Sequence, residues 1–157
     1  MSVIDINEQR KQAQLEAVNQ MIEFSQKFIM VTFEKEGIHC YLDAKKDPKL
    51  ATGDWDDVSF LAYPHRHLFK FRVEIEVFHN DRELEFIQVK RQCERWLGDG
   101  TLMLDHKSCE MMSDDLLRLI ADKWPNRSVK IEVSEDGENG SISYYDPIDS
   151  SYKLVKA

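Results

Sequence analysis

The sequence predicts an α+β domain in which helices pack on one face of an antiparallel four-stranded sheet, with an extra helix at the N-terminus. Two patterns carry this prediction. Apolar and polar residues alternate from Leu68 to Phe78, as expected of a strand with one buried and one solvent-facing side. From Phe86 onward the apolar residues recur every three or four positions instead, which is the period of an amphipathic helix. A chain of 157 residues with both patterns has the size of one domain.

The N-terminal part of the chain predicts a helix and then a strand. Residues 5–27 are polar, and their apolar residues have helical spacing: Leu15, Val18, Met21 and Ile22. Residues 28–33 (FIMVTF) predict a strand, which residues 38–42 could continue past a bulge at Gly37. Residues 43–57 are expected to form a loop, because they contain proline, glycine and five aspartates.

The C-terminal half predicts two helices and then two strands. The helices are expected at residues 86–97 and 112–120, since glycines follow the first and a proline follows the second. Just before the first helix, residues 83–87 could begin a strand that returns along the sheet. Residues 129–135 and 141–145 predict a hairpin, because a DGENG turn separates them.

These elements divide the chain into three parts. Residues 1–27 are expected to form a helical extension, and residues 28–145 the domain itself. Residues 146–157 form a short tail, which could either be mobile or add an edge strand to the sheet.

Composition excludes some classes of function. The net charge is −8 and no run of Lys or Arg exceeds two residues, so a nucleic-acid-binding role is not expected. The sequence has neither the apolar segment of a signal peptide nor a run long enough to cross a membrane. Its three cysteines are odd in number and form no CxxC pair: Cys40, Cys93 and Cys109. Free thiols in a reducing compartment are therefore expected, which favours a cytoplasmic protein of a bacterium or a phage-infected cell.

Three histidines form a candidate metal site. His65 and His67 lie two positions apart at the start of the longest predicted strand, so their side chains share one face. His39 can supply a third imidazole from the neighbouring strand. Three protein ligands with an open fourth position are typical of a catalytic zinc site. The same spacing also occurs in ordinary strand-end histidines, and His79 and His106 could be ligands or surface residues.

Four motifs, in order, resemble those of the 6-pyruvoyl-tetrahydropterin synthase and 6-carboxy-tetrahydropterin synthase family. Members carry a zinc histidine on the first strand and an HGH pair opening the second; here FEKEGIH ends in His39, and PHRHLFKFRVEIEV supplies His65 and His67. The family segments MDFxxLK, LDHKNL and VxE correspond to LEFIQVK, LDHKS and IEVSE of this chain. The resemblance extends from residue 33 to residue 145.

This resemblance implies a fold, a chemistry and an assembly. The fold would be the tunnelling fold, whose domains assemble into ring-shaped homo-oligomers with sites between subunits. The activity would be that of a zinc-dependent lyase or synthase acting on a reduced pterin such as dihydroneopterin triphosphate, in pterin or deazapurine synthesis. Asp105 and His106 would correspond to the pair that assists the catalytic base, and Glu135 to the residue that anchors the pterin ring. From the residues alone, Asp105 and His106 could equally cap a helix, and Glu135 could be a surface charge.

The chain departs from the family pattern at two functional positions. The family's catalytic cysteine precedes the HxH pair, but residues 54–64 contain none, which leaves Cys40 or an aspartate, Asp56 or Asp57, as candidate bases. Arg66 replaces the glycine of HGH and offers a cation for a phosphate or carboxylate, directed away from the histidines. These departures leave a second function open: a non-catalytic oligomer that binds a purine- or pterin-like ligand, such as a phage accessory protein.

Overall fold

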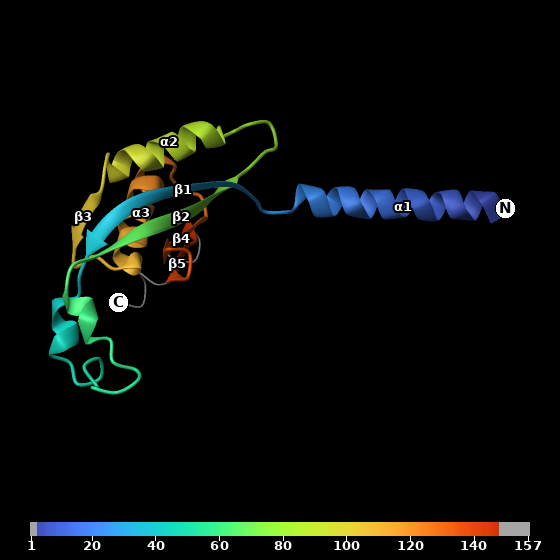
Figure 1. The fold of residues 1–157 in the computed structure, drawn as a ribbon. Helices are drawn as coiled ribbons and strands as arrows, with labels where there is room; N and C mark the ends of the chain where they lie inside the picture. The colour runs from blue at the N-terminus through green and yellow to red at the C-terminus, as the bar shows by residue number, and fades with distance from the viewer. Residues whose placement is uncertain (1–2, 148–157) are drawn as a thin grey trace, which may run out of the picture.

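The computed structural model describes residues 3–147, with side chains from residue 6, and has an α+β architecture (Figure 1). The expected α+β class is confirmed. Residues 148–157, most of the predicted tail, lie outside the described part. In chain order the elements are α1 (Val3–Glu23), β1 (Lys27–His39), the short 3₁₀ helices η1 (Leu42–Lys45) and η2 (Ser59–Ala62), β2 (His65–Val77), α2 (Phe86–Leu97), β3 (Leu102–Asp105), α3 (Cys109–Lys123), β4 (Val129–Glu135) and β5 (Asn139–Tyr145).

The sheet has five strands in the order β3-β1-β2-β4-β5, and it is mixed rather than antiparallel. The strand pairs β1–β2, β2–β4 and β4–β5 are antiparallel, but β3 lies parallel to β1. The prediction of a four-stranded antiparallel sheet is therefore wrong in strand number and in direction at one edge. β3 has only four residues, which is too short a run for alternation to reveal a strand or its partner.

Two local expectations also differ from the structure. β1 is continuous and Gly37 pairs directly with His67, so no bulge interrupts its pairing with β2. The ladder shifts instead on the β3 side of β1, between Ile38 and His39. Residues 83–87 form no returning strand, because the Glu85 side chain accepts a hydrogen bond from the Ile87 amide and caps α2.

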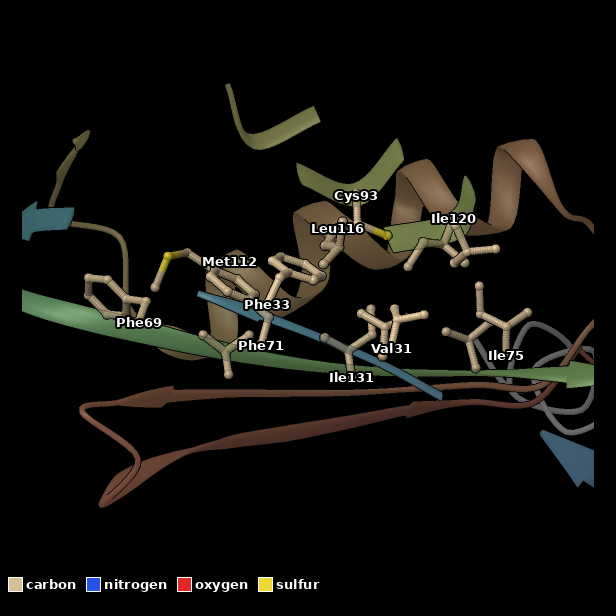
Figure 2. Close-up of a cluster of buried hydrophobic side chains, with 14 of the residues drawn as sticks. Val31, Phe33, Phe69, Phe71, Ile75, Cys93, Met112, Leu116, Ile120 and Ile131 are labelled. Atoms are coloured by element: carbon tan, nitrogen blue, oxygen red, sulfur yellow. The ribbon is translucent and has the colours of Figure 1, made fainter. Parts of the chain in front are cut away.

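The core fills the space between one face of the sheet and the helices α2 and α3. Figure 2 shows sheet side chains pointing to one side, toward Cys93 of α2 and Leu116 and Ile120 of α3. The strands contribute alternate residues, among them Phe33 and Phe71, whose rings stack 5.0 Å apart. The helices thus cover a single face of the sheet, as the alternating pattern predicts.

Helix α1 extends away from the rest of the chain (Figure 1). Every described side chain from Ile6 to Gln26 is exposed, including the apolar residues that have helical spacing. The helix ends at Glu23, somewhat before the predicted end at residue 27. In the described part of the chain, none of the helices combines the length and the apolar character needed to cross a membrane.

Candidate metal centre and adjoining pocket

The strand pairing brings three histidines together at one end of the sheet. Antiparallel pairing places the C-terminal end of β1 beside the N-terminal end of β2, with His39 opposite His65 and Gly37 opposite His67. One ring nitrogen from each histidine lies within 4.8 Å of the others, so these residues could hold a metal ion. We call His39, His65 and His67 the histidine cluster. It is the set that the sequence predicts.

The floor of the histidine cluster is apolar and tightly packed. Phe69, which is fully buried, has its ring centroid 5.3 Å from that of His39 and 5.7 Å from that of His67. Gly37 makes this packing possible, because a Cβ at that position would lie 2.8 Å from Phe69 and from Leu104. The rings of His39 and His67 therefore pack against the buried Phe69 side chain, which restricts their movement.

Two of the three rings are oriented by backbone carbonyl groups. His39 Nδ1 lies 2.9 Å from the Lys107 carbonyl oxygen, and His65 Nδ1 lies 2.7 Å from the Tyr63 carbonyl oxygen. A carbonyl oxygen only accepts hydrogen bonds, so Nδ1 carries the proton in both rings. In the neutral ring each Nε2 then has a free lone pair, as in histidines that bind metals through Nε2.

The third ring is oriented by a carboxylate. His67 Nδ1 donates to Asp136 Oδ2 over 2.6 Å, which leaves its Nε2 as an acceptor too. This hydrogen bond is the main reason that the pKa of Asp136 lies below its usual value, with a backbone hydrogen bond from Leu68 adding to the effect. In the neutral form of each ring, all three histidines thus present an unprotonated Nε2.

Glu135 faces two of these lone pairs. Its carboxylate oxygens lie 3.3 Å from His39 Nε2 and 3.7 Å from His67 Nε2. The shorter contact does not have hydrogen-bond geometry, and His39 Nε2 is buried without a hydrogen-bond partner. Acceptors that face each other in a partly buried site repel unless a cation lies among them. The donor set therefore fits a divalent metal ion bound by imidazoles, which is the chemistry of zinc.

A pocket of about 680 Å³ adjoins the histidine cluster. Its walls come from the end of β1 and the residues that follow it, the start of α3, the end of β4 and the start of β5. The polar groups on these walls are His39, Cys40, Tyr41, Asp43, His65, His106, Lys107, Ser108, Cys109, Glu110, Glu135 and Asn139. Small-molecule sites generally have volumes of about 300–1,000 Å³, so the pocket can accommodate a bicyclic ligand beside the histidines.

The two thiols in the pocket wall differ in environment. Cys109 is buried, and its burial raises the pKa of the thiol to about 12, helped by the negative charges of Glu135 and Glu110. At neutral pH this thiol stays protonated and is a poor base. Cys40 is only partly buried and lines the same pocket, directly after His39. Of the two cysteines, Cys40 is therefore the better placed for proton transfer.

The structure separates the two residues predicted to act as a pair. His106 lines the pocket, whereas Asp105 lies outside its wall at the end of β3. No hydrogen bond joins the two side chains within the described residues, and the Asp105 carbonyl oxygen instead accepts from the Cys40 amide. Neither residue caps α3, because the Ser108 side chain does so by accepting from the Met111 amide.

The other predicted polar residues lie away from the pocket. Arg66 projects from the opposite face of the sheet, where it is largely exposed and pairs with Glu36 at 3.3 Å. Asp57 accepts hydrogen bonds from Gly53 and Ser59, which lower the pKa of its carboxyl and make it a weak base. Asp56 accepts from Thr52 in the same loop. These aspartates stabilise the loop rather than line the pocket.

Sequence reasoning missed Asp136 and the carbonyl groups of Lys107 and Tyr63. Carbonyl contacts leave no trace in residue type, so no sequence signal could have found them. Asp136 did have a sequence signal, because it is an acidic residue directly after Glu135. It is also the first residue of the DGENG segment, however, which is equally typical of a hairpin turn.

Comparisons with known proteins found no match at the sequence level. No protein-family model matches the chain. No curated protein sequence matches it either.

Proposed function

We propose that this protein is a zinc-dependent lyase that acts on a reduced pterin such as dihydroneopterin triphosphate, with the histidine cluster as its metal site. The observation that carries the proposal is the convergence of three imidazoles, with one ring nitrogen of each within 4.8 Å of the others, beside a carboxylate and at the wall of a pocket large enough for a pterin. The motif resemblance from residue 33 to residue 145 supports the same substrate class.

Each side chain has a role in this proposal. His39, His65 and His67 would hold zinc, which acts as a Lewis acid toward oxygen atoms of a bound substrate. Glu135 borders both the histidines and the pocket. Its carboxylate can accept two parallel hydrogen bonds from the N–H groups of an aminopyrimidinone edge. The ring of the substrate is thereby oriented with its side chain toward the metal site.

Proton transfer would use the acid–base groups that line the pocket. His106 and Cys40 both line the pocket, from the segments that follow β3 and β1. Of the two, we assign the base to His106, because an imidazole can take and return a proton near neutral pH. Asp105 has no part in this assignment, since it makes no hydrogen bond to His106.

A second function is favoured by the state of Cys109. This thiol stays protonated, and residues 54–64 contain no cysteine at the position where the family has its catalytic one. The protein would then bind a purine- or pterin-like ligand without turning it over. For either function we propose a ring-shaped homo-oligomer. Within the described residues no strand pairs with the outer edge of β5, and this edge would pair with another subunit.

The experiment has three parts on the purified, untagged chain. Metal content is measured by mass spectrometry, turnover of dihydroneopterin triphosphate by chromatography, and ligand binding by thermal shift with pterins and purines. We expect about one zinc per chain, as for a three-histidine site, and its loss in His65→Ala and His67→Ala. His79→Ala is the matched control, because that exposed histidine lies in the loop after β2.

The outcomes separate the two functions. Conversion of the substrate supports the lyase, whereas stabilisation by a pterin or purine without conversion supports the binding function. A protein that binds no zinc, and that no pterin or purine stabilises, contradicts both.

A further inference from the structure

We propose that Asp136 is a positioning residue that holds His67 in the tautomer able to bind a metal, and so sets the affinity of the histidine cluster. The inference rests on the proposed metal site and adds to it a residue that neither the sequence motifs nor the family resemblance assigns.

Asp136 is held rigidly beside His67. It follows β4 directly, in the turn to β5, with a positive φ of 55°. Its amide donates to the Leu68 carbonyl oxygen over 3.1 Å, and its Oδ1 accepts from the Leu68 amide over 2.9 Å. These two bonds join the turn to the residue that follows His67. The remaining oxygen, Oδ2, is thereby presented to His67 Nδ1 at 2.6 Å.

This contact determines which nitrogen of His67 is free. A neutral imidazole has one N–H and one lone pair, and a carboxylate can only accept. Nδ1 must therefore carry the proton, and the lone pair is on Nε2, 3.7 Å from Glu135 Oε2 and directed into the cluster. An outer hydrogen-bond partner of this kind orients metal-binding histidines and raises their basicity.

Among the three histidines, His67 alone depends on a side chain for this effect. His39 and His65 donate to backbone carbonyl groups, which substitution does not remove. A single change at Asp136 can therefore alter the tautomer of one ligand while the other two keep theirs.

Asp136→Asn is the sharpest test, because asparagine has the shape of aspartate but replaces one acceptor by a donor. If its oxygen accepts from the Leu68 amide, its NH₂ group faces His67 Nδ1 and favours the tautomer with the proton on Nε2. If the amide is turned around, its NH₂ group instead faces the Leu68 N–H. Only the first orientation satisfies both neighbours, because the second sets two N–H donors against each other. Asp136→Asn should therefore place the proton of His67 on Nε2 and remove that ligand.

The experiment measures zinc affinity by competition with a chelator, in the full chain and in Asp136→Asn. Loss of an outer partner typically weakens binding by about 10- to 100-fold, which is the expected result. Glu138→Gln is the matched control: it removes one negative charge from the same turn, where the Glu138 side chain is exposed and its amide donates to the Glu135 carbonyl oxygen. Its zinc affinity should equal that of the unchanged protein.

A second measurement reads the tautomer without metal. Long-range ¹⁵N–¹H spectra of the zinc-free protein should show the Nδ1–H form of His67, and the Nε2–H form in Asp136→Asn. A purely structural role for Asp136 would not change this signal. If Asp136→Asn does not fold, the spectrum of the unchanged protein still decides, because an Nε2–H form of His67 overturns the inference.

The result distinguishes the inference from the proposed function. If the unchanged protein binds no zinc, the metal site and the inference both fail. If it binds zinc and Asp136→Asn binds equally tightly, the positioning role is wrong and the metal site stands.

Discussion

Glu135 Oε1 and His39 Nε2 lie 3.3 Å apart without forming a hydrogen bond. Neutral His39 cannot donate through Nε2, because its one proton is on Nδ1, bonded to the Lys107 carbonyl oxygen. Two acceptors thus face each other in a site where the His39 side chain is only 11% exposed. A cation between them turns this unfavourable contact into a stabilising one.

Replacing this carboxylate should stabilise the zinc-free protein. In Glu135→Gln the amide N–H can donate to His39 Nε2, which replaces a repulsive contact with a hydrogen bond worth about 1 kcal/mol. For a chain of this size we expect the melting temperature of the zinc-free protein to rise by about 2–4 °C. Scanning calorimetry in the presence of a chelator measures it. A lower melting temperature would contradict the acceptor–acceptor assignment.

Zinc itself should stabilise the unchanged protein and not the cluster variants. A ligand that binds only the folded state adds about 2.7 kcal/mol when its concentration is 100 times its dissociation constant. Thermal unfolding with and without added zinc should therefore show a clear rise for the unchanged protein and for His79→Ala. No rise is expected for His67→Ala, and an equal rise there would place the metal elsewhere.

Gly37→Ala should loosen the floor of the cluster. The new Cβ would lie 2.8 Å from Phe69 and from Leu104, and overpacking of a core typically destabilises by about 1–3 kcal/mol. Because Phe69 supports the rings of His39 and His67, zinc affinity should fall as well. Urea unfolding and chelator competition measure the two effects. Met30→Ala, on the exposed face of the same strand, serves as control and should change neither.

Glu83 should make stability depend on acidity. A hydrogen bond from Arg127, together with one from the Phe78 amide, lowers the pKa of Glu83 to about 2 from an ordinary value of 4.5. A lowered pKa stabilises the folded state above pH 4.5, and this contribution is lost as the pH falls toward 2. Urea unfolding at several pH values should show a shallower acid loss in Glu83→Gln. The exposed Glu138→Gln is the control, and an unchanged slope in Glu83→Gln would contradict the assignment.

Removal of residues 1–24 should leave the domain folded. The described side chains of α1 are exposed, so the helix contributes no burial to the core. Gln26, which bonds Glu76 and Ser128, stays in the shortened chain. Calorimetry should give a melting temperature close to that of the full chain. A large drop would mean that α1 is buried in an assembly, which light scattering would reveal as a change in mass.

Local sequence patterns were enough to predict most helices and strands, and the shared face of His65 and His67. Alternation from Leu68 to Phe78 identified β2 and its buried face, and the same parity placed His65 and His67 on that face. This works because side-chain direction in a strand depends only on the count of residues. The four-residue β3 was not predicted, because it is too short to show alternation. Its parallel partner β1 also lies more than sixty residues earlier in the chain, so no local pattern indicates the pairing.

The sequence by itself determined the α+β class, the three histidines as a candidate set, and the expectation that Glu135 lies near them. Tertiary structure decided the rest. It placed His39 opposite His65, excluded Arg66 and Asp105 from the pocket, and brought Asp136 to His67 across 69 residues of sequence. Those relationships depend on strand register and turn geometry, which are set by packing of the whole sheet and not by any short run of residues.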